Sequence, residues 1–241
     1  MNLLVYETPE ELEAAAARDF VARAERAINE RGRFAVSLAG GSTPRDTYQA
    51  LAQDYAERLD WSRVHVFFGD ERTVPPQHED SNYRMARETL LAHIRVGSVH
   101  RMRCELPPGE AAVNYEEQLR EFFGPSEKLP RFDLILLGLG EDGHTASLFP
   151  ETAALAVNDR WVVANPVLKL ETARLTLTIP VINAARAVIF LVAGEEKAEA
   201  LREVIEGAAD PRAYPAKFVQ PEGELAWMVD RAAASLIRKS A

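Results

Sequence analysis

The segment LLGLGEDGHTASLFP at residues 136–150 holds the residue types that a catalytic loop needs. Glycines, acids, a histidine and two hydroxyl residues follow an apolar run, and Pro150 ends the segment. His144 can act as a general base because imidazole titrates near neutral pH. Asp142, two residues earlier, can orient the ring and hold its tautomer. A hydrogen-bonded structural histidine is the alternative, but the glycine-rich setting favours catalysis.

The same glycines, Gly138, Gly140 and Gly143, also match the GxGxxG pattern of a dinucleotide-binding loop. That loop requires a helix of about three turns after the glycines and an acid at the end of the next strand. Pro150 comes only seven residues after Gly143, and the next expected strand, WVVAN, ends in Asn165. Dinucleotide binding is therefore disfavoured.

A second loop, AGGSTP at residues 39–44, follows the apolar run RFAVSL. Gly40 and Gly41 allow a ligand to approach the backbone closely, and Ser42 and Thr43 offer hydroxyls where a helix begins. Unpaired N–H groups and the helix dipole favour an anion at such a position. The loop predicts a sugar-binding or phosphate-binding site, and the alternative is a tight turn with a capping serine.

A third loop begins with GDER at residues 69–72, after VHVFF. It continues as the long polar stretch TVPPQHEDSNYR, in which Ser81 and Asn82 precede an expected helix. Long polar loops at the carboxyl end of a strand often contact ligands, which makes Asp70, Arg72 and Asn82 candidate binding residues. A salt-bridged surface is the alternative.

The elements that must position these loops are short apolar strands that alternate with helices. The expected strands are NLLVYE, RFAVSLAG, VHVFFGD, FDLILLGLG, WVVAN, ARLTLTI and AVIFLVAG. Helical spacing of apolar residues predicts helices over 9–30, 44–56 and 81–94, with Ser42 or Thr43 and Ser81 as N-caps. The stretch at 107–110 is expected to be a loop, and the tail GELAWMVDRAAASLIRK a short strand and a helix capped by Asp230. This alternation predicts an α/β fold with a mostly parallel sheet between two helical layers, a three-layer α/β/α sandwich of modified Rossmann-like type.

Composition limits the classes of function. The 241 residues are 47% hydrophobic, enough for one sizeable core, so we expect a single domain over 1–241. The formal charge of -9 disfavours nucleic acid and anionic membranes as partners. Cys104 is the chain's one cysteine, which rules out a disulfide framework and favours a reducing compartment. MNLLVYETPEELE carries no signal-peptide pattern, so we expect a cytoplasmic protein.

LAGGSTP, GDER followed by SN, and LGLGEDGHTASLFP, in this order, resemble the 6-phosphogluconolactonase family. The resemblance continues through ARLTLT at 173–178, GEEKAEAL at 194–201 and the pattern Trp227, Asp230, Ala233, and so covers nearly the whole chain. It implies hydrolysis of 6-phospho-D-glucono-1,5-lactone to 6-phosphogluconate, the second step of the oxidative pentose phosphate pathway. It also implies a fold shared with glucosamine-6-phosphate deaminases and no metal or organic cofactor. The lack of HExxH, CxxC and P-loop motifs agrees with the last point.

In this interpretation His144 takes a proton from the attacking water, and backbone N–H groups of the Gly40–Gly41 turn or the Gly143 turn bind the oxyanion. Arg72, Arg174 and Lys197 are the candidate cations for the phosphate. The oligomeric state, monomer or small homo-oligomer, stays open.

Three alternatives remain beside this interpretation. The first is a covalent mechanism with Ser42 or Ser147 as nucleophile, although neither lies in a GxSxG motif. The second is a sugar-phosphate sensor that binds without reacting. The third is a glucosamine-6-phosphate deaminase, whose family pattern places a glutamate where this chain has Phe149.

Overall fold

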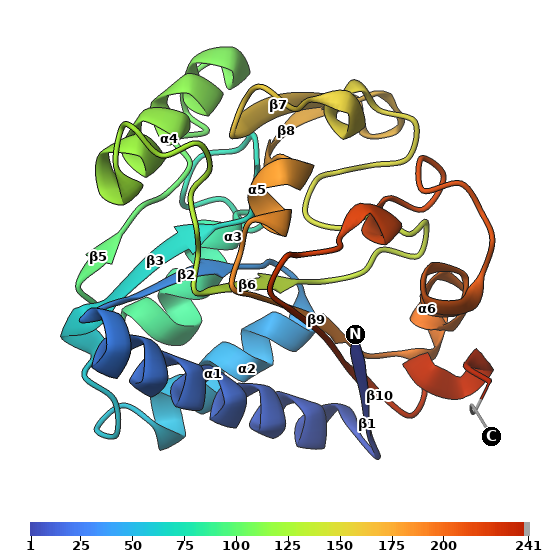
Figure 1. Cartoon of the computed structure of the whole chain (residues 1–241), viewed down its shortest axis with the longest axis horizontal. Helices are drawn as coiled ribbons and strands as arrows, with labels where there is room; N and C mark the ends of the chain where they lie inside the picture. Colours follow the sequence, from blue (N-terminus) through green and yellow to red (C-terminus); the bar gives the residue numbers. More distant parts are fainter. Residues whose placement is uncertain (239–241) are drawn as a thin grey trace.

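The computed structural model describes residues 1–238 and builds them around a parallel sheet of seven strands (Figure 1). From one edge to the other the strands are β1 (Asn2–Tyr6), β10 (Glu224–Asp230), β9 (Ala187–Val192), β6 (Leu134–Leu137), β2 (Phe34–Leu38), β3 (Val64–Phe68) and β5 (Ser98–Val99). Helices cover both faces of this sheet (Figure 1). The predicted three-layer α/β/α fold is therefore confirmed.

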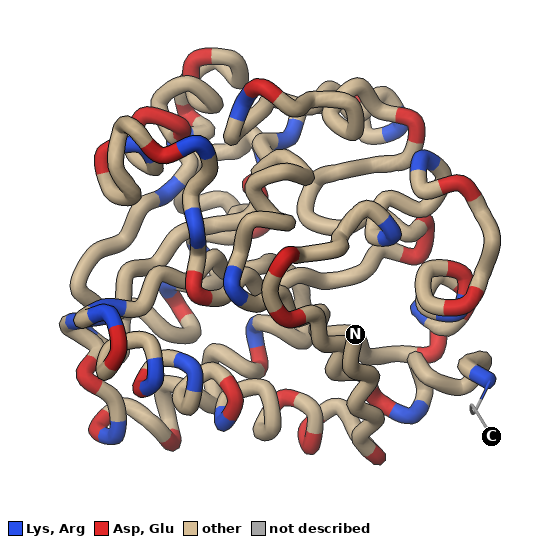
Figure 2. Tube along the Cα trace, in the orientation of Figure 1, with Lys and Arg blue, Asp and Glu red and all other residues tan. Residues whose placement is uncertain are grey.

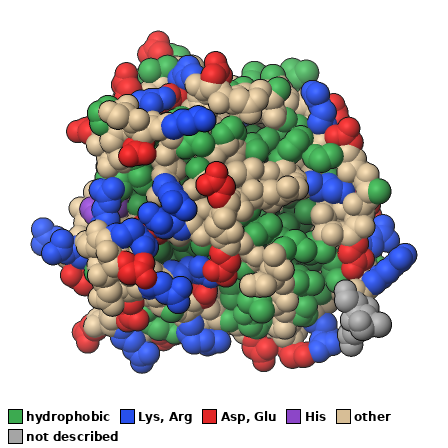
Figure 3. Space-filling view, viewed as in Figure 1, with side chains coloured by type: hydrophobic (Ala, Val, Ile, Leu, Met, Phe, Trp, Pro, Cys, Tyr) green, Lys and Arg blue, Asp and Glu red, His purple; other side chains and the backbone are tan. Residues whose placement is uncertain are grey.

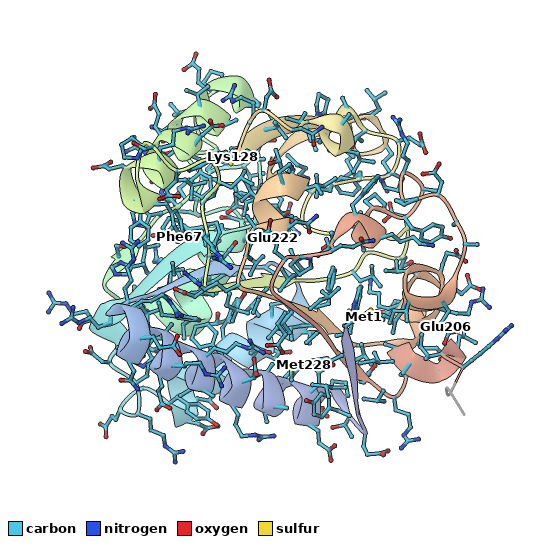
Figure 4. The ribbon with its side chains drawn as sticks, in the orientation of Figure 1. Met1, Phe67, Lys128, Glu206, Glu222 and Met228 are labelled. Atoms are coloured by element: carbon cyan, nitrogen blue, oxygen red, sulfur yellow. The ribbon has the colours of Figure 1, made fainter. Side chains whose placement is uncertain are left out.

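The helices divide the apolar core into two clusters, one on each face of the sheet. α1 (Pro9–Arg31), α2 (Ser42–Asp54) and α3 (Asn82–Ala86) pack on one face. α4 (Pro108–Phe123), α5 (Ile179–Asn183) and α6 (Ala198–Glu206) pack on the other. Strands that are covered on both faces are largely apolar along their whole length, which explains continuous runs such as AVIFLV. Figure 4 labels one buried residue of each cluster, Met228 and Phe67.

Helix α1 illustrates how the local sequence sets an element. Thr8 caps it by accepting a hydrogen bond from the Glu11 N–H, Pro9 opens its first turn, and Gly32 ends it in the left-handed region at φ 76°. Its apolar side chains lie against the sheet, while charges of both signs follow its outer side (Figure 2). Lys, Arg, Asp and Glu side chains also intermingle over the molecular face in Figure 3.

A second sheet of three antiparallel strands lies on the α4 and α5 side of the main sheet (Figure 1). It consists of β4 (Asp70–Arg72), β8 (Thr172–Leu177) and β7 (Val162–Val167). The alternation predicted one mostly parallel sheet, but WVVAN and ARLTLTI belong to this second, antiparallel sheet. The four residues between β7 and β8 are too few for a parallel crossover, which needs a dozen or more residues, so the two strands form a hairpin.

Several element boundaries differ from the predictions near the candidate loops. Gly41, not Ser42 or Thr43, is the N-cap of α2, and the two hydroxyl residues lie inside its first turn. The Ser81 cap is confirmed, because its Oγ accepts a hydrogen bond from the Arg84 N–H at 3.1 Å. The helix predicted over 81–94 consists of α3 followed by a π-helical turn at Arg87–Leu91.

Two further segments also depart from expectation. The stretch 107–110 is not a loop, because Pro108 opens α4, where a missing N–H is tolerated. The tail forms β10 as expected, but it continues as a 3-10 turn, Ala233–Leu236, and Lys239 of the predicted helix lies outside the described residues. The Asp230 carboxylate does accept a hydrogen bond from the Ala233 N–H at 2.7 Å. Among residues 1–238, no helix combines the length and apolarity that a membrane span requires.

Candidate active site

A cavity of about 330 Å³ opens at the carboxyl edge of the parallel sheet. β6, β2 and β3 are neighbours in the sheet, so the loops that follow them meet at this edge. All three loops singled out in the sequence line the cavity, together with the end of β9 and residues Glu196 and Lys197. The sheet order therefore brings motifs 100 residues apart into one site.

The histidine loop, residues 138–150, places a paired imidazole and carboxylate in this region. His144 lines the cavity, and its Nδ1 lies 2.5 Å from Oδ1 of Asp142. The His144 backbone N–H donates to the same oxygen at 3.2 Å. A Cβ on Gly140 would lie 2.0 Å from His144 Nδ1, so only glycine leaves room for the pair.

The charge state of Asp142 fixes the tautomer of His144. Burial by itself would raise the pKa of Asp142, but hydrogen bonds from His144 and Lys169 outweigh it and hold that pKa well below its ordinary value. The ionised carboxylate can only accept, so Nδ1 carries the proton and Nε2 keeps its lone pair. The Asp142 side chain itself is not part of the cavity wall, and His144 stands between it and a ligand.

Phe149 holds the other side of the imidazole. Its ring stacks on the His144 ring with centroids 4.2 Å apart and planes tilted by 26°. The loop between them is held by the Thr145 hydroxyl, which donates to the Gly138 carbonyl at 2.8 Å. Ala146 takes a left-handed φ of 47°, a conformation that residues other than glycine rarely adopt outside constrained loops.

The glycine loop supplies backbone donors to the cavity. Gly41, with φ 107°, turns the chain into α2, whose first-turn N–H groups have no partner inside the helix. Ser42 and Thr43 belong to this first turn and line the cavity. A Cβ on Gly40 would lie 2.0 Å from Oδ1 of Asn82, so glycine is also required where this loop meets the third loop.

Asp70 and Asn82 form a buried hydrogen-bonded pair on the cavity wall. The Asn82 amide donates to the Asp70 carbonyl at 3.0 Å and to the Asp70 carboxylate at 3.2 Å. The Ser147 hydroxyl donates to the other carboxylate oxygen at 2.7 Å. The Asp70 carboxylate therefore joins the histidine loop to the third loop.

Glu71 organises the third loop, and the sequence analysis missed it. Its buried carboxylate accepts hydrogen bonds at 2.8 Å from the N–H groups of Arg72, Asn82 and Tyr83, and one from the Ser81 hydroxyl at 3.1 Å. Burial raises the pKa of Glu71, although these hydrogen bonds oppose the shift. The acid beside Asp70 in GDER was the available signal, but the sequence does not show that its carboxylate is buried and accepts backbone N–H groups.

The candidate cations occupy two places. Arg72 lines the cavity and lies directly opposite Arg174 in the β4–β8 pairing, while its Nη1 donates to the Asp80 carbonyl at 2.6 Å. Nε of Arg174 is buried, and within residues 1–238 it has no hydrogen-bond partner. Burial, and then the nearby charge of Arg72, lower the pKa of Arg174. Arg174 itself lies outside the cavity wall.

Lys197 reaches the cavity from the opposite side, just before α6. Its Nζ lies 3.8 Å from Glu141, a partner on the histidine loop. The buried carboxylate of Asp230 accepts hydrogen bonds from the Gly194 N–H at 3.2 Å and thereby anchors the turn that carries Lys197. No cluster of three or more His, Cys, Asp or Glu side chains within 1–238 is arranged to hold a metal ion.

Comparisons with known proteins show the family of the chain. The family model for glucosamine-6-phosphate isomerases/6-phosphogluconolactonase matches residues 7–227, so the chain belongs to this family. A 6-phosphogluconolactonase of Synechocystis sp. is 48% identical over 220 residues, which cover 90% of each chain. One of Nostoc sp. is 45% identical, with 87% of each chain covered. The structure of the 6-phosphogluconolactonase of Trypanosoma brucei superposes with a TM-score of 0.87 at 32% identity and covers 98% of each chain.

Proposed function

We propose that this protein hydrolyses 6-phospho-D-glucono-1,5-lactone to 6-phospho-D-gluconate, a reaction of the oxidative pentose phosphate pathway. The observation that carries the proposal is the hydrogen bond between Asp142 and His144, whose imidazole lines a cavity together with Gly40–Thr43, Arg72 and Lys197. Family membership supports it, as do relatives named 6-phosphogluconolactonase that match nearly the whole chain. We place the reaction in the cytoplasm, as the sequence predicts.

In the proposed mechanism Nε2 of His144 removes a proton from water as the water oxygen attacks the lactone carbonyl carbon. A tetrahedral oxyanion forms, and its collapse breaks the bond between that carbon and the ring oxygen. The proton on Nε2 then passes to the leaving ring oxygen, which regenerates the neutral base. Ionised Asp142 stabilises the transient imidazolium and keeps Nε2 directed at the substrate. These steps use no metal or organic cofactor.

Backbone amides of the glycine loop are the better candidates for the oxyanion site. The Gly143 N–H already donates to the Gly140 carbonyl at 2.9 Å, and Gly140 N–H donates to the His144 carbonyl at 2.9 Å. In contrast, the Gly40–Gly41 turn and the first turn of α2 border the cavity. The N–H groups in the first turn of a helix have no partner within the helix, so they are available to an oxyanion. We therefore assign the oxyanion to this side.

The phosphate is assigned to the cations that flank the cavity. Two opposed arginines, Arg72 and Arg174, repel each other until an anion lies between or beside them, and a guanidinium can bind phosphate with two parallel hydrogen bonds. Lys197 adds a third positive charge at the wall. In a chain of net charge -9, this local concentration of cations supports binding of a dianionic substrate.

The covalent alternative is weaker in this geometry. Ser147 is buried, and its hydroxyl donates to Asp70 rather than to an imidazole. A nucleophilic serine must reach the substrate carbonyl, and Ser147 does not line the cavity. We therefore favour direct attack by water.

The test is a hydrolysis assay with freshly generated lactone, corrected with an enzyme-free control because the lactone also hydrolyses unaided. We expect a clear acceleration by the wild-type protein. Binding of 6-phosphogluconate without acceleration of hydrolysis would instead identify a sugar-phosphate sensor, and a covalent adduct trapped by mass spectrometry would support a serine nucleophile.

Glucosamine-6-phosphate is the parallel substrate in this assay. A deaminase must shuttle protons between adjacent sugar carbons, which calls for a further carboxylate besides the one that orients the histidine, and the deaminase pattern places a glutamate at position 149. Here the phenyl ring of Phe149 is stacked on His144 and cannot carry a proton. We expect no ammonia release, and ammonia production at a rate comparable with lactone hydrolysis would contradict the proposed function.

A further inference from the structure

The tip of the β7–β8 hairpin reaches over the histidine loop. Leu168–Leu170 forms a single 3-10 turn, and Glu171 closes it in the left-handed region at φ 49°. Leu168 is 89% exposed, so burial of apolar side chains does not account for the position of this turn. Neither the sequence motifs nor the reaction steps above assign this turn a role.

Lys169, at the centre of the turn, contacts both partners of the candidate base. Its Nζ forms an ion pair with Oδ2 of Asp142, while Oδ1 of the same carboxylate binds His144. The ammonium also lies 4.8 Å from the centroid of the Phe149 ring, which stacks on His144. A side chain from a separate sheet thus completes the surroundings of the imidazole.

We propose that Lys169 is a positioning residue, which sets the proton affinity of His144 by sharing the charge of Asp142. An ionised carboxylate beside a histidine favours the imidazolium form, in which Nε2 cannot act as a base. The ammonium compensates part of that carboxylate charge and keeps the imidazole neutral at lower pH. Lys169 also fixes which carboxylate oxygen faces His144. The kinetic consequence rests on the proposed function, whereas the effect on His144 titration does not.

Other charged groups face the same region and would be unchanged in a Lys169 variant. Asp70, Arg72, Glu196 and Lys197 line the cavity, and Glu141 on the histidine loop is paired with Lys197. Lys169 differs from all of them because its partner is the carboxylate that binds the imidazole. A comparison of single variants therefore isolates its contribution.

The test compares K169M, which keeps most of the length of the side chain and removes its charge, with K169R, which keeps the charge. The matched control is K128M, at an exposed lysine in the segment after α4 (Figure 4). We expect the acidic limb of the pH profile of kcat/KM to move to higher pH by about 0.5–1 unit in K169M. Without the Lys169 ammonium, the full charge of Asp142 acts on His144, and solvent screening limits the change to this order. K169R and K128M should retain the wild-type limb.

A second readout follows the His144 imidazole by NMR in substrate-free protein. The midpoint of its titration should move to higher pH in K169M by the same amount, and K169R should restore it. An unchanged titration midpoint of His144 in K169M would overturn the proposal. The proposal would also be wrong if K169M lost activity equally at all pH values while the acidic limb of its pH profile stayed in place. If the wild-type protein fails to hydrolyse the lactone, the NMR titration still tests the role of Lys169, so the two failures are distinguishable.

Discussion

Two histidine sites in this molecule use similar packing for opposite purposes. The His144 ring stacks on Phe149 at 4.2 Å, and the His100 ring stacks on Phe67 at 4.4 Å. His144 has an ionised carboxylate at Nδ1, whereas Nε2 of His100 lies 2.8 Å from the uncharged hydroxyl of Ser98. The difference shows that the hydrogen-bond partner, not the aromatic contact, decides whether an imidazole is prepared to accept a charge.

The second site joins two histidines through one oxygen. Ser98 Oγ lies 2.8 Å from Nδ1 of His65 as well as from Nε2 of His100. Burial, followed by the charge of Arg33, lowers the pKa of His65. Burial, followed by repulsion from His65, lowers the pKa of His100. Both rings therefore favour the neutral form, and the hydrogen bond between His65 and Ser98 links the paired strands β3 and β5.

The largest expected effect comes from removing the charge-accepting imidazole. H144A should lose about 10²–10⁴-fold in the catalysed rate, because general-base assistance is typically of that size. Binding of 6-phosphogluconate, measured by calorimetry, should be largely retained. H93A, at an exposed histidine outside the cavity, is the matched control. Near-normal turnover of H144A after subtraction of the enzyme-free rate would remove the general-base assignment.

The partner should matter nearly as much as the imidazole. In D142N the Lys169 ammonium retains the amide oxygen, which turns the amide NH₂ toward Nδ1 of His144. An NH₂ donor selects the tautomer with the proton on Nε2, so no lone pair faces the substrate. We expect kcat/KM to fall by about 10²-fold through this loss of the correct tautomer.

The control for D142N is its urea unfolding midpoint, which separates loss of the tautomer from loss of the fold. A folded D142N protein with wild-type activity would mean that the carboxylate is dispensable and that the comparison between the two histidine sites has no catalytic meaning.

Arg174 extends the comparison to a buried group that remains positively charged. His65 and His100 can remain neutral, but a guanidinium stays protonated, so burial beside Arg72 leaves it in need of an anion. We expect R174M to raise KM for the phosphorylated lactone about tenfold or more, since a hydrogen bond to a charged group contributes ~1.5–3 kcal/mol. kcat should change little.

Unphosphorylated D-glucono-1,5-lactone provides the control substrate for R174M. Its hydrolysis should be equally slow with wild-type protein and variant, because it lacks the group that Arg174 is proposed to bind. An equal loss on both substrates would assign Arg174 to the β4–β8 sheet instead of to the phosphate.

The sequence predicted the parallel sheet well because its strands carry their own signal. LILL and AVIFLV are continuous apolar runs, which are typical of a parallel strand that is covered on both faces. β4 could not be predicted in the same way, since Asp70–Arg72 is three polar residues whose strand conformation depends on pairing with β8. The separation of β7 and β8 from the main sheet likewise depends on which strands pair with each other, and the spacing of apolar residues does not indicate this.

The site followed the same rule. The three loops were found because glycines, acids and a histidine stand together in the chain, and their sheet neighbours brought them to one edge. Lys169 and Glu71 were missed because their roles depend on distant contacts. Lys169 meets Asp142 from 27 residues away, on a hairpin whose fold the alternation pattern misassigned. Local composition identifies the loops of the site, but only tertiary contacts show which distant side chains bind and position them.

The smallest expected effect tests the neutral histidine site. The folded-state pKa values of His65 and His100 lie below the ordinary value of 6.5, so the unfolded chain takes up protons first as the pH falls. Stability that is fully present above pH ~6.5 is therefore lost progressively below it. H100F keeps a ring on Phe67 but cannot be protonated, so between pH 7.5 and 5.0 its Tm should fall less than that of wild type, by about one or two degrees. Thermal unfolding at both pH values measures this, with H93Q at an exposed histidine expected to follow wild type. If the Tm of H100F falls as steeply as that of wild type, the histidines around Ser98 do not resist protonation. The contrast with His144 would then depend on the Asp142 carboxylate alone, and burial of His65 and His100 would contribute nothing to it.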